Sequence, residues 1–152
     1  MEQVLIIFVL VFFNAYFSLS EVALISARKN RLELDAKAGS RAARMALKLQ
    51  GNPDLYLSTA QIGITIVSIL TGIYSSAELS DDLSQVFVGW GVSESTAGWA
   101  AKGTILFVAT YLQCELGELF PKRLGIDMAD SMARMCAPSM LFFSRVMKPF
   151  VW

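Results

Sequence analysis

Three glutamates lie within stretches of sequence that are otherwise mostly apolar, and their carboxylates are the groups best placed to do chemistry. They are Glu21, Glu115 and Glu118. An ionised side chain at the centre of a bilayer costs about 2.5–3.5 kcal/mol on insertion scales, so a carboxylate on a membrane helix needs a partner. Glu21 and Glu118 could also lie nearer the interface. Lys102 stands at the far end of the third apolar stretch, so we expect no base on that helix to neutralise the glutamates. A bound cation is the simplest partner.

A proline close to two of these carboxylates indicates a break in the helix. Pro121 has no N–H, so the carbonyl of Gly117 loses its helical hydrogen-bond partner. A free carbonyl beside Glu118 suits a hard cation such as Mg²⁺, which takes oxygen ligands at about 2.0–2.1 Å. Broken membrane helices recur in ion sites near the bilayer midplane. The alternative is that Pro121, followed by Lys122, merely ends the helix.

Polar side chains also form a stripe on each apolar stretch. Asn14, Ser18 and Glu21 share one helical face by their spacing. The second stretch carries Ser58, Gln61, Thr65, Ser68, Gly72 and Ser75, and the third carries Thr104, Tyr111, Glu115 and Glu118 beside Gly117. Any single hydroxyl is more readily explained by helix packing, where a hydrogen bond contributes about 0.6 kcal/mol. Secondary polar candidates for a site are Asn14, Ser20, Thr65, Gly72 and Glu115.

The composition agrees with a membrane-embedded chain. Of 152 residues, 55% are hydrophobic and 17% charged, whereas soluble domains carry about 25% charged residues. Thirteen basic residues balance thirteen acidic ones, which argues against nucleic-acid binding. The absence of histidine excludes His-based acid–base catalysis and His-ligated zinc. Two cysteines, Cys114 and Cys136, are too few for a disulfide framework.

Three stretches are long enough to span a bilayer, which takes about 20 mostly apolar residues. They cover about 4–26, 55–76 and 97–120. The first lacks the preceding basic residues and the cleavage site of a signal peptide. Between the first two, residues 28–50 form a basic amphipathic helix, and residues about 124–152 form a C-terminal juxtamembrane segment. We therefore predict an all-α membrane protein with three transmembrane helices and amphipathic juxtamembrane helices.

Charges between the spans predict the orientation. The first connection is rich in bases: Arg28, Lys29, Arg31, Lys37, Arg41, Arg44 and Lys48. The second holds the acids Glu78, Asp81, Asp82 and Glu94 and no base. By the positive-inside rule, residues 28–50 and the C-terminus are cytoplasmic and the N-terminus is outside. We expect a multi-pass protein of a cell membrane, such as a bacterial inner membrane.

Three blocks of residues resemble one family when taken in order. They are Phe17-Ser-Leu-Ser-Glu-Val-Ala-Leu24, Leu57-Ser-Thr-Ala-Gln-Ile-Gly-Ile-Thr-Ile-Val-Ser68 and Gly117-Glu-Leu-Phe-Pro-Lys122. In these blocks the chain resembles the transmembrane domain of the CorC/cyclin M (CNNM) magnesium transporters over nearly its whole length. The resemblance implies a homodimer with three transmembrane helices per subunit and no enzymatic activity. It also implies that cytoplasmic nucleotide-binding CBS domains and a C-terminal domain lie beyond this chain.

The resemblance further implies a Mg²⁺ site among the three helices and export of Mg²⁺ coupled to Na⁺ entry. Ser18, Ser68 and Glu118 then correspond to side-chain ligands, Gly117 contributes a carbonyl, and Glu21 occupies a nearby polar position. Many relatives have Asn where this chain has Ser68, a change that keeps an oxygen but shortens its reach. The main alternative function is a Mg²⁺-sensing membrane anchor that does not transport. An intramembrane aspartyl protease is disfavoured because its paired aspartates are not found.

Overall fold

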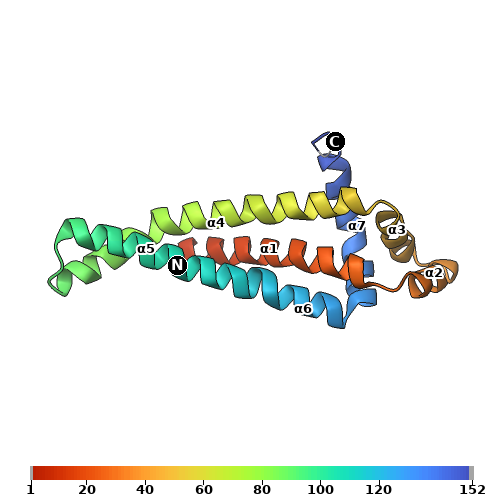
Figure 1. The fold of residues 1–152 in the computed structure, drawn as a ribbon, viewed down its shortest axis with the longest axis horizontal. Coiled ribbons are helices and arrows are strands. Elements are labelled where there is room, and N and C mark those ends of the chain that lie inside the picture. The colour runs from red at the N-terminus through yellow and green to blue at the C-terminus, as the bar shows by residue number, and fades with distance from the viewer. Residues whose placement is uncertain (1, 151–152) are drawn as a thin grey trace.

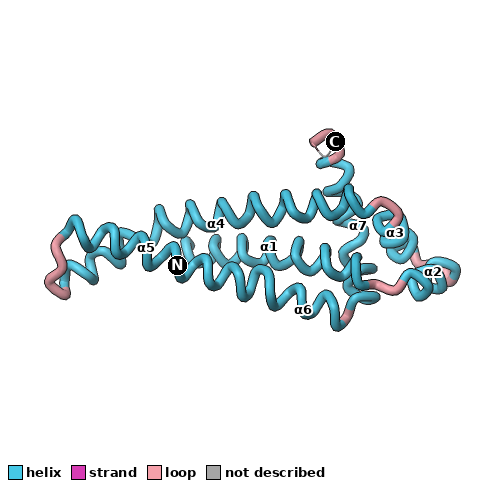
Figure 2. Tube along the Cα trace, in the orientation of Figure 1, coloured by secondary structure: helices cyan, strands magenta, loops and turns pink. Residues whose placement is uncertain are grey.

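The computed structural model describes residues 2–150, without the side chains of residues 2–3 and 76–78. Helices form almost all of this part of the chain, which confirms the all-α prediction (Figure 2). In chain order they are α1 (Glu2–Ser26), α2 (Lys29–Lys37), α3 (Arg41–Gln50), α4 (Pro53–Gly89), α5 (Glu94–Cys114), the π-helical turn η1 (Glu115–Leu119), α6 (Phe120–Asp127) and α7 (Ala129–Met147).

Helices α1, α4 and the α5–η1–α6 segment lie side by side along the long axis of the molecule (Figure 1). Helix α4 runs antiparallel to the other two, and the α4–α5 hairpin extends past the N-terminus of α1. At the opposite end, α7 crosses the bundle, with α2 and α3 beside it. The bundle therefore has three long elements and a helical layer across one end.

The long helices differ in part from the predicted spans. Among the described residues, two helices are long and apolar enough to cross a membrane, Val4–Ser26 and Pro53–Gly89. The second has 37 residues, about 55 Å at 1.5 Å per residue, so it exceeds both the predicted range 55–76 and a hydrocarbon core of about 30 Å. The predicted third span, 97–120, is divided between α5, η1 and the start of α6.

The segment predicted as one helix over 28–50 forms two. Gly39, between α2 and α3, has a φ of +101°, in the left-handed region where a side chain is strained. Ser40 then caps α3 by accepting a hydrogen bond from the Ala43 amide at 3.2 Å. A left-handed glycine followed by an N-cap ends one helix and begins another, which the amphipathic pattern does not reveal.

The apolar core lies where α7 meets the ends of α1, α3 and α4. Small buried residues let these helices approach closely: Ala23, Ala43, Ala46, Ala60, Ala133 and Ala137. Phe17 on α1 packs edge-to-face against Phe143 on α7, with ring centroids 5.3 Å apart. The core thus holds α7 against the bundle at the end predicted to be cytoplasmic.

An ion pair strengthens this end of the molecule. The carboxylate of Asp130 on α7 accepts a hydrogen bond from the Arg28 amide at 2.8 Å and one from its guanidinium at 3.0 Å. Arg31 lies 3.7 Å away. Desolvation acts to raise the pKa of Asp130, but the Arg28 hydrogen bonds and the charges of Arg28 and Arg31 lower it below its usual value. Asp130 therefore fastens the α1–α2 link to α7.

Candidate cation site

A cluster of polar groups lies in the middle of the bundle, where α1, α4, α5 and η1 meet. The Asn14 side-chain amide donates to the Gly117 carbonyl at 3.1 Å. Ser68 donates to Asn14 Oδ1 at 3.5 Å, and the Gln113 amide donates to Ser68 Oγ at 3.3 Å. Asn14 is 1% exposed and sits near the midpoint of α1, so the network is buried about halfway along this helix. Together with Ser18, these residues are called the mid-bundle cluster below.

Ser18 is assigned to the cluster by its position four residues after Asn14 on α1, the helix that packs against η1 and α6. Asn14 faces Gly117, and Leu19 faces Gly125, where an added Cβ would lie 3.0 Å from the Leu19 carbonyl oxygen. Ser18 lies one helical turn beyond Asn14 on α1. Its side chain is 0% exposed, and Ser18 Oγ has no hydrogen-bond partner within residues 2–150.

Gln113 Oε1 is a second buried oxygen that has no partner in the described part of the chain. Leaving a buried polar group unsatisfied costs about 1–3 kcal/mol, so native proteins rarely do so without a reason. Two such oxygens, one of them on a side chain that lies beside Gly117, indicate a place for a ligand that accepts several oxygen contacts.

The π-helical turn exposes the Gly117 carbonyl to the cluster. The Phe120 amide bonds to the carbonyl of Glu115, five residues back, and Pro121 has no amide to offer Gly117. Single π-helical turns inside α-helices occur frequently at functional sites. A Cβ at position 117 would lie 2.9 Å from Asn14 Nδ2, so a larger residue there would require the Asn14 side chain to shift.

Glu118 is held by a partner that the sequence reasoning overlooked. Its Oε1 lies 2.7 Å from Lys122 Nζ, one helical turn later, with side chains 41% and 33% exposed. Our expectation that no base on this helix neutralises the glutamates was therefore wrong for Glu118. The reason is the i,i+4 spacing, which brings the two side chains together on one face. Glu115 is exposed.

The other predicted residues lie apart from the mid-bundle cluster or use their hydroxyls locally. Ser20 is buried but donates to the Tyr16 carbonyl at 2.6 Å, and Thr65 is exposed and donates to the Gln61 carbonyl at 2.8 Å. Gly72 faces the Leu106 side chain. Glu21 is half-buried on α1.

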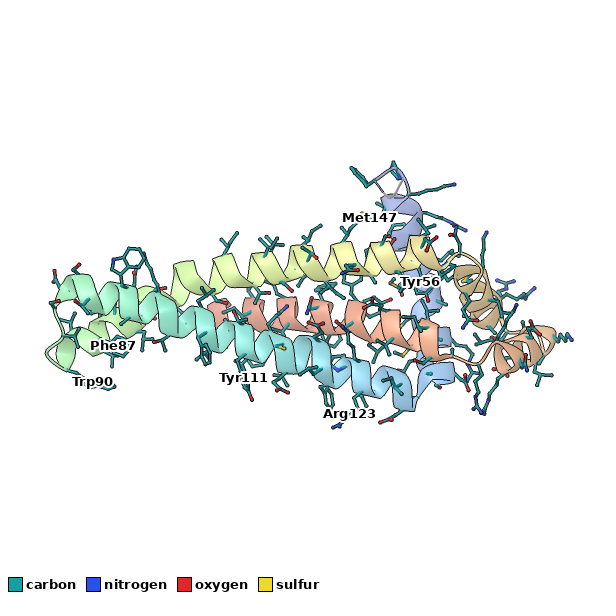
Figure 3. All side chains as sticks on the ribbon, in the orientation of Figure 1. Tyr56, Phe87, Trp90, Tyr111, Arg123 and Met147 are labelled. Atoms are coloured by element: carbon teal, nitrogen blue, oxygen red, sulfur yellow. The ribbon has the colours of Figure 1, made fainter. Side chains whose placement is uncertain are left out.

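Gln113 was missed by sequence reasoning, which chose the wrong face of the third span. Tyr111 is 58% exposed and points away from the bundle, as Figure 3 shows, and Thr104 and Glu115 are exposed too. The available signal was spacing, since Gln113 precedes Gly117 by four residues and so shares its face. Within the described residues, no group of three or more His, Cys, Asp or Glu side chains could hold a metal. A cation here would rest mainly on neutral oxygens.

Long apolar helices around a buried polar cluster, closed at one end by amphipathic helices, define a helical membrane domain. Comparison with known proteins agrees with this class: residues 5–152 match the family model described as the cyclin M transmembrane N-terminal domain. The chain belongs to this family, which confirms the resemblance found in the sequence.

Relatives match along the whole chain. The UPF0053 protein sll0260 of Synechocystis is 39% identical over 150 residues, or 99% of this chain and 34% of that protein. The UPF0053 protein YhdP of Bacillus subtilis is 30% identical over 150 residues, again 99% of this chain and 34% of the relative. A polyamine export protein of Salmonella typhimurium is 33% identical over 152 residues, all of this chain and 34% of the relative. The chain thus spans about a third of the length of these relatives.

Proposed function

We propose that this domain binds Mg²⁺ at the mid-bundle cluster and takes part in its export across the membrane, coupled to Na⁺ entry. One observation carries the proposal: within the described residues, Ser18 Oγ and Gln113 Oε1 are buried without a hydrogen-bond partner, and the Gln113 side chain lies beside Gly117 in the π-helical turn. Mg²⁺ takes oxygen ligands, and this cluster presents oxygens from three long elements. The membership of the cyclin M family supports the proposal.

The ligand set would combine neutral oxygens with one carboxylate. Ser18, Ser68 and the Gly117 carbonyl supply dipoles, and Glu21 lies farther along α1. Glu118 follows Gly117 directly and supplies the negative charge when the incoming cation displaces the Lys122 ammonium. A site with few charges suits a transported ion, because binding must be strong enough for entry and weak enough for release.

A second candidate cargo is a polyamine, since the Salmonella typhimurium and Escherichia coli relatives are named polyamine export proteins. Ammonium groups would donate hydrogen bonds to the same oxygens. The compact cluster favours a single small ion, however, because Asn14 and Ser18 are one helical turn apart, as are Gln113 and Gly117. A long polyamine needs acceptors spread along a path.

The test compares the two cargoes on one full-length protein containing this domain. We expect millimolar MgCl₂ to raise its melting temperature, and the shift to shrink in Ser68→Ala but not in Thr65→Ala, a matched loss of an exposed hydroxyl on the same helix. Spermidine should give a smaller shift that is insensitive to Ser68→Ala.

Transport is then measured as Mg²⁺ flux from liposomes with and without a Na⁺ gradient. Binding without flux would favour the sensing anchor over the transporter. A spermidine shift that depends on Ser68, with no effect of MgCl₂, would replace Mg²⁺ with a polyamine as the cargo.

A further inference from the structure

Gln113 is the member of the mid-bundle cluster in which only one end of the side-chain amide forms a hydrogen bond within the described residues. It lies on α5, is 8% exposed, and donates its amide to Ser68 Oγ at 3.3 Å. The carbonyl oxygen of the same side chain has no partner in the described residues. We infer that Gln113 is a direct ligand of the transported cation and supplies a neutral carbonyl oxygen to it.

The position of the side chain beside Gly117 supports this role. A Cβ built on Gly117 would lie 3.5 Å from Gln113 Cδ and 2.9 Å from Asn14 Nδ2, so both amides converge on the space above this glycine. Gln113 Oε1 is bonded to that Cδ atom, about 1.2 Å away. The oxygen therefore lies within reach of the same small volume as the Gly117 carbonyl and the Asn14 side chain.

The hydrogen bond to Ser68 fixes which end of the amide is free. With Nε2 engaged by Ser68 Oγ, Oε1 is the end left to accept a contact. An amide carbonyl is an oxygen ligand that hard cations such as Mg²⁺ and Mn²⁺ accept, and it adds no negative charge. Gln113 would then bring α5 into the cation site. Through its hydrogen bond to Ser68, it would also couple cation binding to α4.

This inference rests on the proposed function, so the experiment separates the two. Mg²⁺ and Mn²⁺ affinities are measured by calorimetry on the full-length protein, with three variants. Gln113→Met keeps the length of the side chain without an oxygen, Gln113→Glu keeps an oxygen and adds charge, and Gln61→Met changes an exposed glutamine on α4.

We expect Gln113→Met to weaken Mg²⁺ binding at least about tenfold, the lower end of the cost of losing a metal-site partner. Gln113→Glu should bind at least as tightly as the parent, and Gln61→Met should be unchanged.

A spectroscopic readout tells ligation from a purely structural role. Mn²⁺ is bound in place of Mg²⁺ to protein made by cell-free synthesis with ¹³C-labelled glutamine. Direct ligation produces a ¹³C hyperfine coupling to Mn²⁺, which should disappear in Gln113→Met and persist in Gln61→Met. If the parent binds but shows no coupling, and Gln113→Met binds equally well, Gln113 is not a ligand and the proposed function stands without it. If the parent binds neither ion, the proposed function itself fails.

Discussion

The two glutamates near the π-helical turn differ in what surrounds them, and that difference predicts different effects on cation binding. Glu118 is half-buried, follows Gly117 and pairs with Lys122, whereas Glu115 is exposed. We expect Glu118→Gln to abolish the stabilisation by Mg²⁺, because a ligand that no longer binds adds nothing to the free energy of unfolding. Melting curves with and without millimolar MgCl₂ measure this, with Glu115→Gln as the control that keeps most of the shift. The reverse pattern would mean that Glu115 is the ligand.

A side chain at position 117 should displace the side chain of Asn14 and so destabilise the fold. An alanine Cβ would lie 2.9 Å from Asn14 Nδ2, so Gly117→Ala should lower the melting temperature. Gly103→Ala is the matched control, since nothing lies within 4 Å of a Cβ there and alanine favours a helix by about 1 kcal/mol over glycine. Combining Gly117→Ala with Asn14→Ala should destabilise less than the sum of the two. Additive effects would show that the two residues do not touch.

At the scale of elements, the contact between α7 and the α1–α2 link should depend on pH. The pKa of Asp130 is lowered on folding, so its stabilising contribution is complete above the ordinary carboxyl value of 3.8. That contribution is lost as the pH falls through the lowered pKa. We expect Asp130→Asn to reduce the melting temperature near neutral pH, and the difference from the parent to vanish in acid. Asp127→Asn, an exposed change on α6, is the control. A difference that persists in acid would mean that the Asp130 charge is not responsible.

At the scale of the whole molecule, the charge distribution predicts the topology. Asp81, Asp82 and Glu94 lie at the α4–α5 hairpin, and the basic α2 and α3 lie at the opposite end (Figure 1). In a Cys114→Ser background, we expect Ser95→Cys to react with an impermeant thiol reagent from outside the cell and Asn30→Cys to react from the cytoplasmic side. Both positions are exposed. Labelling of Ser95→Cys from the cytoplasm would reverse the predicted orientation.

We also propose that two copies associate about a twofold axis. Three long elements are too few to enclose a path for an ion, and Thr104 and Thr110 are exposed on the part of α5 predicted to lie in the membrane. Polar groups facing lipid are unfavourable, and a second copy could cover them. Native mass spectrometry from a mild detergent should show a dimer. A monomer alone would count against this arrangement.

Much of the fold was determined by the sequence itself, because a helix in lipid must satisfy its backbone hydrogen bonds within its own segment. Hydropathy therefore located α1 and the first part of α4. That the Gly117 carbonyl lacks its usual helical donor was also predictable, since the residue four positions later is a proline.

The composition of the mid-bundle cluster was decided only by the tertiary structure. Asn14, Ser68 and Gln113 meet because α1, α4 and α5 pack in one particular register, and the spacing within each helix does not determine the register between helices. The face of α5 that turns inward was likewise set by packing, which placed Gln113 inside and Tyr111 outside. Local sequence determined each helix because its hydrogen bonds are local. The site required contacts between residues as far as 103 positions apart in the chain.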